Sequence, residues 1–335
     1  MVDVASVPGI GEADVWVDKV PELQNGWRPT GGPPNPVADE GLLNWPIQAL
    51  TWRTRHLYNR ELERRLDVSI ELTVGPGGQH ATLGAALEVL SLMQPRLRAQ
   101  SVIGTVRLLA GFELAEQVIV RGLNLGWVRI IADQPTVIIR RGALTIAIDG
   151  SYPAFAAIHG GVLPQIAALF VMSTEGTATG RCGLLAYMGG NAQVTPGAGI
   201  QNAGGYGLIA SQGGVVIALG ADFRNAGSDA VRATASGSAS VISAILTGAG
   251  GAGVFCHKGA TVDCQDAILS GAASNGIYCA LAGRVNAHNA NCRRGASDSS
   301  ADIAVAQGGT IVATGTTGGT SIATNTTTPS GVIYK

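Results

Sequence analysis

The chain has 335 residues, of which 13% are charged and 5% are aromatic, and its formal net charge is −1. Binding to nucleic acid requires a broad basic surface, so this charge balance predicts a protein that does not bind nucleic acid. The hydrophobic fraction of 46%, together with 48 glycines, excludes a disordered polyelectrolyte.

The longest apolar run, residues 162–172, is far shorter than the roughly 20 residues that a membrane-spanning helix needs. Residues 1–11 lack the basic start and the apolar core of a signal peptide. The sequence therefore predicts no insertion into a membrane.

The N-terminal part is predicted to form an extended attachment segment over residues 1–42, because residues 26–36 are dense in proline and glycine. An α-helix is predicted over residues 43–72. Apolar residues with heptad-like spacing run along it: Leu43, Ile47, Leu50 and Leu57. Such a stripe indicates an oligomerisation stem, although packing onto the same chain stays open.

Residues 44–63, NWPIQALTWRTRHLYNRELE, resemble a segment near the N-terminus of many tail fibre proteins of tailed bacteriophages. The family pattern is N-x-P-x-x-x-L-x-x-R-T-x-x-L. Its positions are matched here by Asn44, Pro46, Leu50, Arg53, Thr54 and Leu57. The resemblance implies a virion subunit that contacts tail, baseplate or head proteins through its N-terminal segment.

Residues 74–90, VGPGGQHATLGAALEVL, resemble the entry to pectate-lyase-like right-handed β-helices, in which a glycine-rich turn precedes T-[IL]-x-x-A-[IL]. Thr82 is predicted to cap a helix over residues 83–93. The apolar face of that helix is suited to covering the open end of a solenoid.

Residues 204–296 repeat with a period of 23 residues. The apolar positions of each repeat form three pairs, and the second member of each pair lies two positions after the first. A spacing of two positions is the period of a β-strand, whereas a helix places apolar residues three and four positions apart. Each repeat therefore predicts one coil of a parallel β-helix, with about 4.8 Å between successive coils.

The predicted fold is mainly β, a right-handed parallel β-helix with about 23 residues per coil. It is predicted to span residues 73–316, including the capping helix, and to follow the extended segment and the first helix. A C-terminal tail over residues 317–335 either pairs with other chains or caps the last coil. The path of residues 150–172 is left open.

The five cysteines lack the spacing of a metal site. They are Cys182, Cys256, Cys264, Cys279 and Cys292. We predict buried thiols, with a strained disulfide between Cys256 and Cys279 as the alternative, because these two share a column one coil apart. The chain also lacks a phosphate loop, a zinc motif and a nucleophile elbow, so no metal and no cofactor are predicted.

Several apolar residues fall at outward positions of the repeat: Ile209, Ile217, Leu219, Ile242, Phe255 and Tyr278. Apolar residues on both faces of a strand indicate that something covers the outer face. Contact between the subunits of a homotrimer is the favoured interpretation. Stacking of a glycan on Phe255 and Tyr278 is one alternative, and a wrong register of the columns is another.

Polar residues also stack in outward columns. One column holds Ser240, Asp263 and Asn286, and the other holds Ser243, Asp266 and Asn289. Arg284 and His288 are predicted to lie on the coil above the two aspartates and to bind a ligand. Asp and Asn also occupy bends for backbone reasons, so a structural ladder competes with a carbohydrate site in which Asp263 and Asp266 are catalytic.

These features predict a fibre or spike subunit on the surface of a virion that adheres to a host surface polysaccharide. One alternative is a capsular-polysaccharide depolymerase, either a glycoside hydrolase or a lyase. Another is a purely structural head or tail fibre that carries a separate receptor-binding protein. A bacterial surface protein with the same solenoid is a further alternative.

Overall fold

The computed structural model describes residues 50–58, 65–95, 102–293, 302–317 and 331–335. The chain divides into two compact units. One comprises Met1–Asp67 with Met93–Arg98, and the other comprises Val68–Leu92 with Ala99–Lys335. No helix in the described ranges is long and apolar enough to cross a membrane.

In the first unit, residues 50–58 are helical, and Leu50 and Leu57 expose 52% and 57% of their surface. The other two residues of the predicted stripe, Leu43 and Ile47, lie outside the described residues. The strand β1 (Arg65–Leu66) pairs in parallel with β3 (Gln94–Pro95).

The prediction of a helix over residues 43–72 is wrong at its C-terminal end. Residues 65–66 belong to β1, and β2 (Ile70–Val74) begins the solenoid. Residues 70–74 carry apolar side chains at every second position, and this period of two favours a strand over a helix. The solenoid therefore begins before residue 73.

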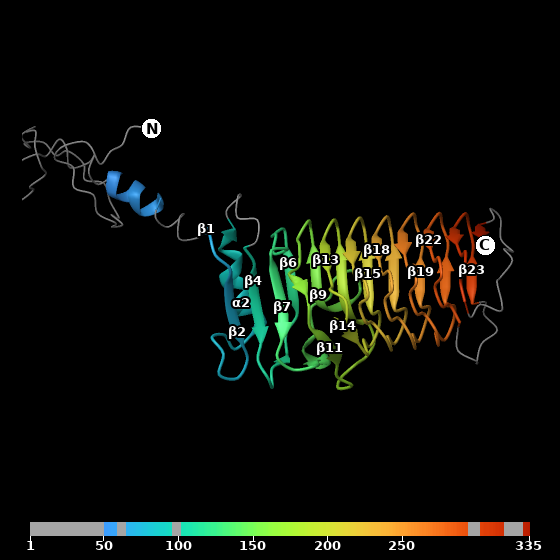
Figure 1. The fold of residues 1–335 in the computed structure, drawn as a ribbon, viewed down its shortest axis with the longest axis horizontal. Helices are drawn as coiled ribbons and strands as arrows, with labels where there is room; N and C mark the ends of the chain where they lie inside the picture. The colour runs from blue at the N-terminus through green and yellow to red at the C-terminus, as the bar shows by residue number, and fades with distance from the viewer. Residues whose placement is uncertain (1–49, 59–64, 96–101, 294–301, 318–330) are drawn as a thin grey trace, which may run out of the picture. The chain divides into compact units, whose positions relative to one another are not determined.

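The helix α2 (Leu83–Ser91) begins at Thr82, whose side chain accepts a hydrogen bond from the amide of Ala85. The carboxylate of Glu116 accepts a second one from the amide of Gly84, at 2.9 Å. Four residues of its apolar face are buried: Leu83, Ala86, Leu87 and Leu90. The helix lies against β2 and β4 at the first coil (Figure 1) and ends two residues before its predicted end.

All pairings between strands are parallel (Figure 1). One four-stranded sheet consists of β2, β4 (Gly104–Leu108), β7 (Val128–Ala132) and β10 (Gln165–Ile166). The other consists of β5 (Glu113–Leu114), β8 (Val137–Ile139), β11 (Leu169–Met172) and β14 (Gly199–Gln201). A short 3-10 helix, Arg141–Ala143, follows β8.

Two longer sheets complete the solenoid. The eight-stranded sheet consists of β6 (Val118–Arg121), β9 (Tyr152–Ile158), β12 (Arg181–Tyr187), β15 (Leu208–Ser211), β17 (Val231–Thr234), β19 (Val254–Cys256), β21 (Ile277–Cys279) and β23 (Ile303–Val305). The seven-stranded sheet consists of β13 (Asn191–Gln193), β16 (Val215–Ile217), β18 (Ser238–Ser240), β20 (Thr261–Asp263), β22 (Arg284–Asn286), β24 (Thr310–Val312) and β25 (Val332–Tyr334). The long, all-parallel sheets form a parallel β-solenoid.

The register joins equivalent residues of the sequence repeat. Leu208 pairs with Val231, Val231 with Val254, and Val254 with Ile277. In the seven-stranded sheet, the side chains of Thr261 and Ser238 meet across one such step of 23 residues. The columns are therefore in register, which excludes the alternative of a wrong register.

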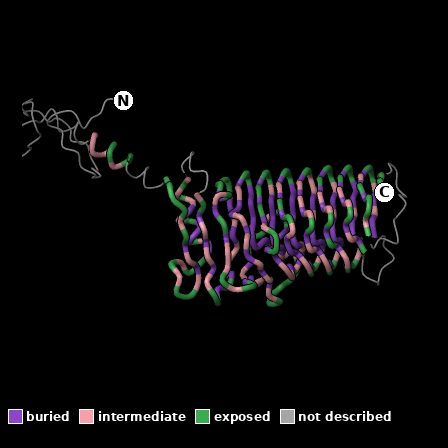
Figure 2. The backbone as a smooth tube through the Cα atoms, viewed as in Figure 1, coloured by how far each residue is buried: buried purple, intermediate pink, exposed green. Residues whose placement is uncertain are grey.

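The predicted inward columns form the core. Figure 2 shows buried residues alternating with more exposed ones along the coils. None of the inward residues of the four coils is more than 3% exposed: Leu208, Ala210, Val216, Ala218, Ala221, Phe223, Val231, Ala233, Ala239, Val241, Ala244, Leu246, Val254, Cys256, Val262, Cys264, Ala267, Leu269, Ile277, Cys279, Val285, Ala287, Ala290 and Cys292. The strand period seen in the sequence is thus confirmed by burial.

The turn between the eight-stranded and the seven-stranded sheet uses the left-handed backbone region. Two successive residues have positive φ, for example Gln212 at 49° and Gly213 at 75°. At the second position most coils carry glycine: Gly160, Gly189, Gly213, Gly259 and Gly308. Ser236 at 62° and Ala282 at 60° are the exceptions, and each adopts a conformation that a side chain disfavours.

The outer face of the early eight-stranded sheet is covered by the chain itself. Ile209 points outward as predicted, but it is only 5% exposed and packs in a buried cluster with Ala156, Ile158, Cys182 and Leu185. Partly buried side chains cover this cluster: Ile119, Ile148, Tyr187 and Tyr206. Little of Ile209 is therefore left for another subunit to contact, and its place in a subunit interface stays a prediction.

The described residues of the tail add one rung to the stack. Val332, Ile333 and Tyr334 pair in parallel with Thr310, Ile311 and Val312. The tail was predicted either to pair with other chains or to cap the last coil, and this pairing corresponds to the cap.

Candidate functional site: a polar groove on the seven-stranded sheet

A groove of about 400 Å³ lies on the outer face of the seven-stranded sheet, over β18, β20, β22 and β24. Its polar lining residues alternate with buried ones along each strand, as in Thr261, Val262 and Asp263. Because side chains alternate between the two faces, the sequence that builds the core on one side builds the groove on the other.

Two outward columns run along the sheet. One passes through Val215, Ser238, Thr261, Arg284, Thr310 and Val332. The other passes through Ile217, Ser240, Asp263, Asn286, Val312 and Tyr334. Each column is polar in its middle rungs and apolar or aromatic at its C-terminal end. At the other end, Val215 and Ile217 pair with the polar residues Asn191 and Gln193 of β13. Tyr334, at the C-terminal end, exposes 57% of its surface.

Hydrogen bonds between rungs hold the middle of the groove. The amide nitrogen of the Asn286 side chain donates to Oδ1 of Asp263 at 3.2 Å, and the backbone N–H of Gln265 donates to the same oxygen at 3.3 Å. On the neighbouring column, the hydroxyl of Thr261 donates to that of Ser238 at 3.1 Å. The carboxylate of Asp263 is thus fixed by its own chain.

Arg284 lines the same groove and is exposed. Neither an ion pair nor a side-chain hydrogen bond joins its guanidinium to any residue in the described ranges. Its neighbours along the column are Thr261 and Thr310, which carry no charge. Arg284 therefore presents an uncompensated positive charge to whatever enters the groove.

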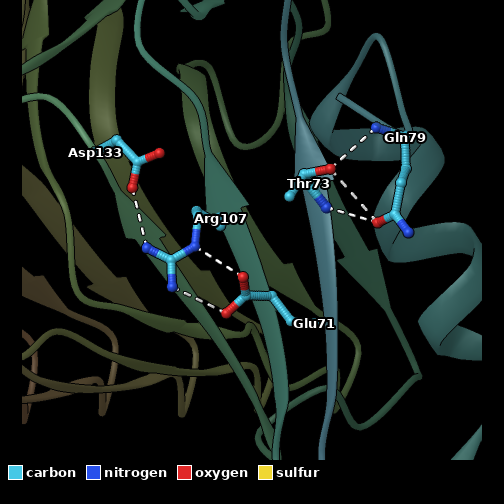
Figure 3. A network of polar contacts seen from close by, with 5 residues as sticks. All are labelled: Glu71, Thr73, Gln79, Arg107 and Asp133. Carbon is cyan, nitrogen blue, oxygen red and sulfur yellow. Dashed lines mark hydrogen bonds and ion pairs between the residues drawn. The ribbon is translucent and has the colours of Figure 1, made fainter. Parts of the chain in front are cut away.

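Arg107 on the first sheet illustrates the opposite arrangement (Figure 3). Its guanidinium donates to Glu71 at 2.8 and 3.0 Å and to Asp133 at 3.0 Å. The hydrogen bond from Arg107 lowers the pKa of Glu71. Beside this network, the Gln79 carboxamide accepts from the backbone N–H of Thr73 at 2.9 Å (Figure 3). These contacts tie the early coils together and leave no free charge on Arg107.

The structure does not place the two candidate catalytic aspartates in one cavity. Asp263 lines the groove, whereas Asp266 does not. Asp266 has a φ of 53°, close to those of Ser243 at 57° and Asn289 at 55° in the same column. Asn and Asp adopt this left-handed conformation more readily than most residues, so Asp266 occupies a bend for backbone reasons. His288, also outside the groove lining, is partly buried.

Phe255 and Tyr278 lie on a different face, the outer face of the eight-stranded sheet. Their rings stack with centroids 5.1 Å apart, and the guanidinium of Arg232 lies 4.8 Å from the centroid of Phe255. Arg232 also donates a hydrogen bond to the hydroxyl of Tyr206 at 2.9 Å. The rings and the cation therefore form a continuous ladder, and they do not share the groove with Asp263.

Two groups beside this ladder have perturbed acidities. Asp229 accepts a hydrogen bond from the amide of Ala252 at 2.9 Å and forms an ion pair with Arg232. Burial raises its pKa, and these contacts oppose the rise without cancelling it. Burial lowers the pKa of His257, whose ring packs edge-on against Phe255.

Of the remaining outward apolar residues, Ile217 and Leu219 expose 42% and 40% of their surface, and Ile242 is partly buried. These three are not covered in the way that Ile209 is, so they are accessible to a partner. Their role in an oligomer stays a prediction.

All five cysteines are buried, and their thiols are free. Burial raises the pKa of Cys292 to about 12 and also raises that of Cys264. Across the described ranges, no group of three or more His, Cys, Asp or Glu side chains has the arrangement of a metal site.

The chain matches no protein-family model and no curated protein sequence. The likeness to tail fibre proteins and to pectate-lyase-like β-helices therefore rests on the two N-terminal segments quoted above.

The sequence analysis missed three polar residues of the groove, Ser238, Thr261 and Thr310. It also missed Tyr334, which continues one of the outward columns. Ser238 and Thr261 were recognisable, because they lie two residues before Ser240 and Asp263 and so share their outward face. Tyr334 was not, because the repeat does not extend to it and only the pairing of β25 with β24 brings it into the column of Val312.

Proposed function

We propose that this chain is a fibre or spike subunit of a phage or phage-like particle that binds a host cell-surface polysaccharide along its seven-stranded sheet. The observation that carries this proposal is the groove with its two columns of polar side chains. Each coil of the groove carries at least one hydroxyl, amide, carboxylate or guanidinium group, with the charges supplied by Asp263 and Arg284. Such groups fix the orientation of a polar ligand. A site that repeats along an axis suits a ligand that is itself a linear polymer.

Attachment to the particle is assigned to the N-terminal segment, on the resemblance of residues 44–63 to tail fibre proteins. The partners would be tail, baseplate or head proteins. We further propose that the solenoid winds right-handed with about 23 residues per coil and that the protein is a homotrimer. The exposed side chains of Leu50 and Leu57 on the first helix support self-association.

Polysaccharide binding is tested with the full-length protein and labelled surface polysaccharide from the host cells, by measuring the dissociation constant. A double variant, Thr261→Ala with Asn286→Ala, removes polar groups from both columns and is expected to weaken binding about tenfold. Thr105→Ala, an outward threonine of β4 away from the groove, is the matched control and is expected to bind normally. Equal binding by the double variant and the wild type would overturn the assignment of the groove.

A depolymerase is less well supported than a binding protein. Hydrolysis of a glycosidic bond generally requires two carboxyl groups on either side of it. Within the described part of the chain, Asp263 is the only carboxylate that lines the groove. We expect the purified protein to bind polysaccharide without releasing reducing ends. Release that is lost in Asp263→Asn would replace the binding proposal with the depolymerase.

The location and the oligomeric state need separate measurements. Gold-labelled antibody on intact particles is expected to mark the surface of the tail or the head, and light scattering is expected to give the mass of a trimer. A monomer at micromolar concentration would contradict the homotrimer. A surface label without any binding of polysaccharide would favour a purely structural fibre that carries another receptor-binding protein.

A further inference from the structure

Part of the positive charge on the solenoid is compensated within the chain. Four arginines form ion pairs with carboxylates: Arg107, Arg140, Arg224 and Arg232. Arg284, in the groove, has no such partner among the residues that the structure describes. Its position is therefore the one place where the polar groove offers a free positive charge.

The other charged group of the groove does not neutralise Arg284. Asp263 lies on the preceding coil but in the other column, where Asn286 is its neighbour. The nitrogen of Asn286 and the backbone N–H of Gln265 donate to its carboxylate. The groove thus presents a cation and an anion on adjacent rungs, each separately available to a ligand.

We propose that the groove selects a glycan with a carboxylate-bearing sugar, and that the carboxylate binds the guanidinium of Arg284. This inference rests on the proposed polysaccharide binding. A guanidinium donates two parallel hydrogen bonds to a carboxylate, which makes the contact specific as well as charged. The hydroxyls of Thr261 and Thr310 flank the guanidinium along the column and bind the neighbouring hydroxyls of the sugar.

The groove also limits how many charges the glycan carries. Asp263 repels a second carboxylate on the adjacent rung, where successive coils are about 4.8 Å apart. The glycan is therefore one in which acidic sugars are separated by neutral ones, and a polymer of consecutive acidic sugars is disfavoured.

The test compares two forms of one probe with the full-length protein. The probe is an acidic polysaccharide with one carboxylate per repeating unit, used either native or with its carboxyl groups chemically reduced to alcohols. Wild type is expected to bind the native form about tenfold or more tightly than the reduced form. Arg284→Gln is expected to lose this preference and to bind the native and the reduced forms about equally.

Arg121→Gln is the matched control, because Arg121 is an exposed arginine at the end of β6 outside the groove lining. It is expected to keep the preference for the native form, and Arg284→Lys is expected to keep part of it. Equal binding of both probe forms by wild type would overturn the acidic-glycan inference and leave polysaccharide binding standing. If the wild type bound neither form of the probe and no host polysaccharide, both the acidic-glycan inference and the proposed polysaccharide binding would be overturned. An unchanged preference in Arg284→Gln would sink the role of this arginine.

Discussion

Ala282 is the residue at which local backbone strain is easiest to measure. It has a φ of 60° at a turn position where most other coils carry glycine. The left-handed conformation costs a residue with a side chain roughly 1–2 kcal/mol, and glycine avoids most of that cost. Side-chain identity at this position therefore contributes to stability without any change in packing.

We expect Ala282→Gly to raise the free energy of unfolding by about 0.5 to 1 kcal/mol, because glycine loses part of the gain to its greater freedom in the unfolded chain. The reverse change, Gly213→Ala, is expected to lower it by a similar amount, since an added methyl group at Gly213 meets nothing within 4 Å and only the backbone matters. Thermal unfolding followed by circular dichroism measures both. Shifts in the same direction for the two variants would refute the argument.

Asp229 makes stability depend on pH. Its folded pKa lies above the ordinary value of 3.8, so the folded state binds its proton more tightly than the unfolded state does. The stabilisation from this group is therefore complete below 3.8 and is lost as the pH rises through the folded pKa.

Asp229→Asn removes this titration and keeps an oxygen that accepts from the amide of Ala252. We expect the variant to become more stable relative to the wild type as the pH rises above 3.8. Denaturant unfolding at a series of pH values measures this difference. A difference that stays constant, or moves in favour of the wild type, would contradict the assigned direction of the pKa.

At the scale of a single coil, the distance between neighbouring backbones decides which residues are tolerated. Gly237 begins the turn into β18, and a methyl group added there would lie 2.2 Å from the carbonyl oxygen of Ala210. On the next coil the equivalent position is occupied by Ala260. On the coil after that it is Gly283, where an added methyl group would lie 2.8 Å from the carbonyl oxygen of Cys256.

Gly237→Ala is expected to destabilise the protein by about 2 kcal/mol, because the backbone near Ala210 would have to shift to admit the methyl group that the next coil already accommodates at Ala260. Gly283→Ala is expected to cost less. The midpoints of thermal unfolding should follow the order wild type, Gly283→Ala, Gly237→Ala. Equal midpoints for the two variants would show that this contact does not limit the coil.

The start of each element was predictable where a local signal marks it. Thr82 caps α2 as expected, because its side chain alone decides that hydrogen bond. The predicted helix over residues 43–72 extended too far, because a charged, heptad-like sequence up to residue 66 concealed the change to a period of two at residue 70. The helical and the strand patterns overlap at this junction, and the pairing of β2 with the distant strand β4 decides that residues 70–74 form a strand.

Across the whole molecule, the repeat predicted the core because each inward column is a property of the sequence alone. It did not predict which outward residues are exposed. Ile209 packs in a cluster that is covered partly by residues outside the repeat, Ile119, Ile148 and Tyr187, and no pattern in the sequence reveals that they meet there. The repeat also did not reveal that Phe255 and Asp263 face different directions, because that depends on the turn between two sheets.

The register of the columns makes a prediction about length. Deleting residues 238–260 removes one whole coil and places Thr261 after Gly237, so that it occupies the position that Ser238 held in the column. We expect this variant to keep the circular dichroism spectrum of the wild type with a lower unfolding temperature. Deleting residues 238–249, about half a coil, puts unlike residues into each column and is expected to prevent folding. Folding of both variants would contradict the importance of the register.

Because equivalent residues stack in the seven-stranded sheet, the length of its outer surface and the chemistry of each rung can change separately. Adding or removing whole coils changes the length of the outer surface in fixed increments, while the side chains of each remaining rung keep their neighbours. Replacing one outward residue changes the chemistry of a single rung and leaves the span untouched. Under the proposed function, ligand preference and length could therefore change independently of one another, through different kinds of mutation in the same short stretch of sequence.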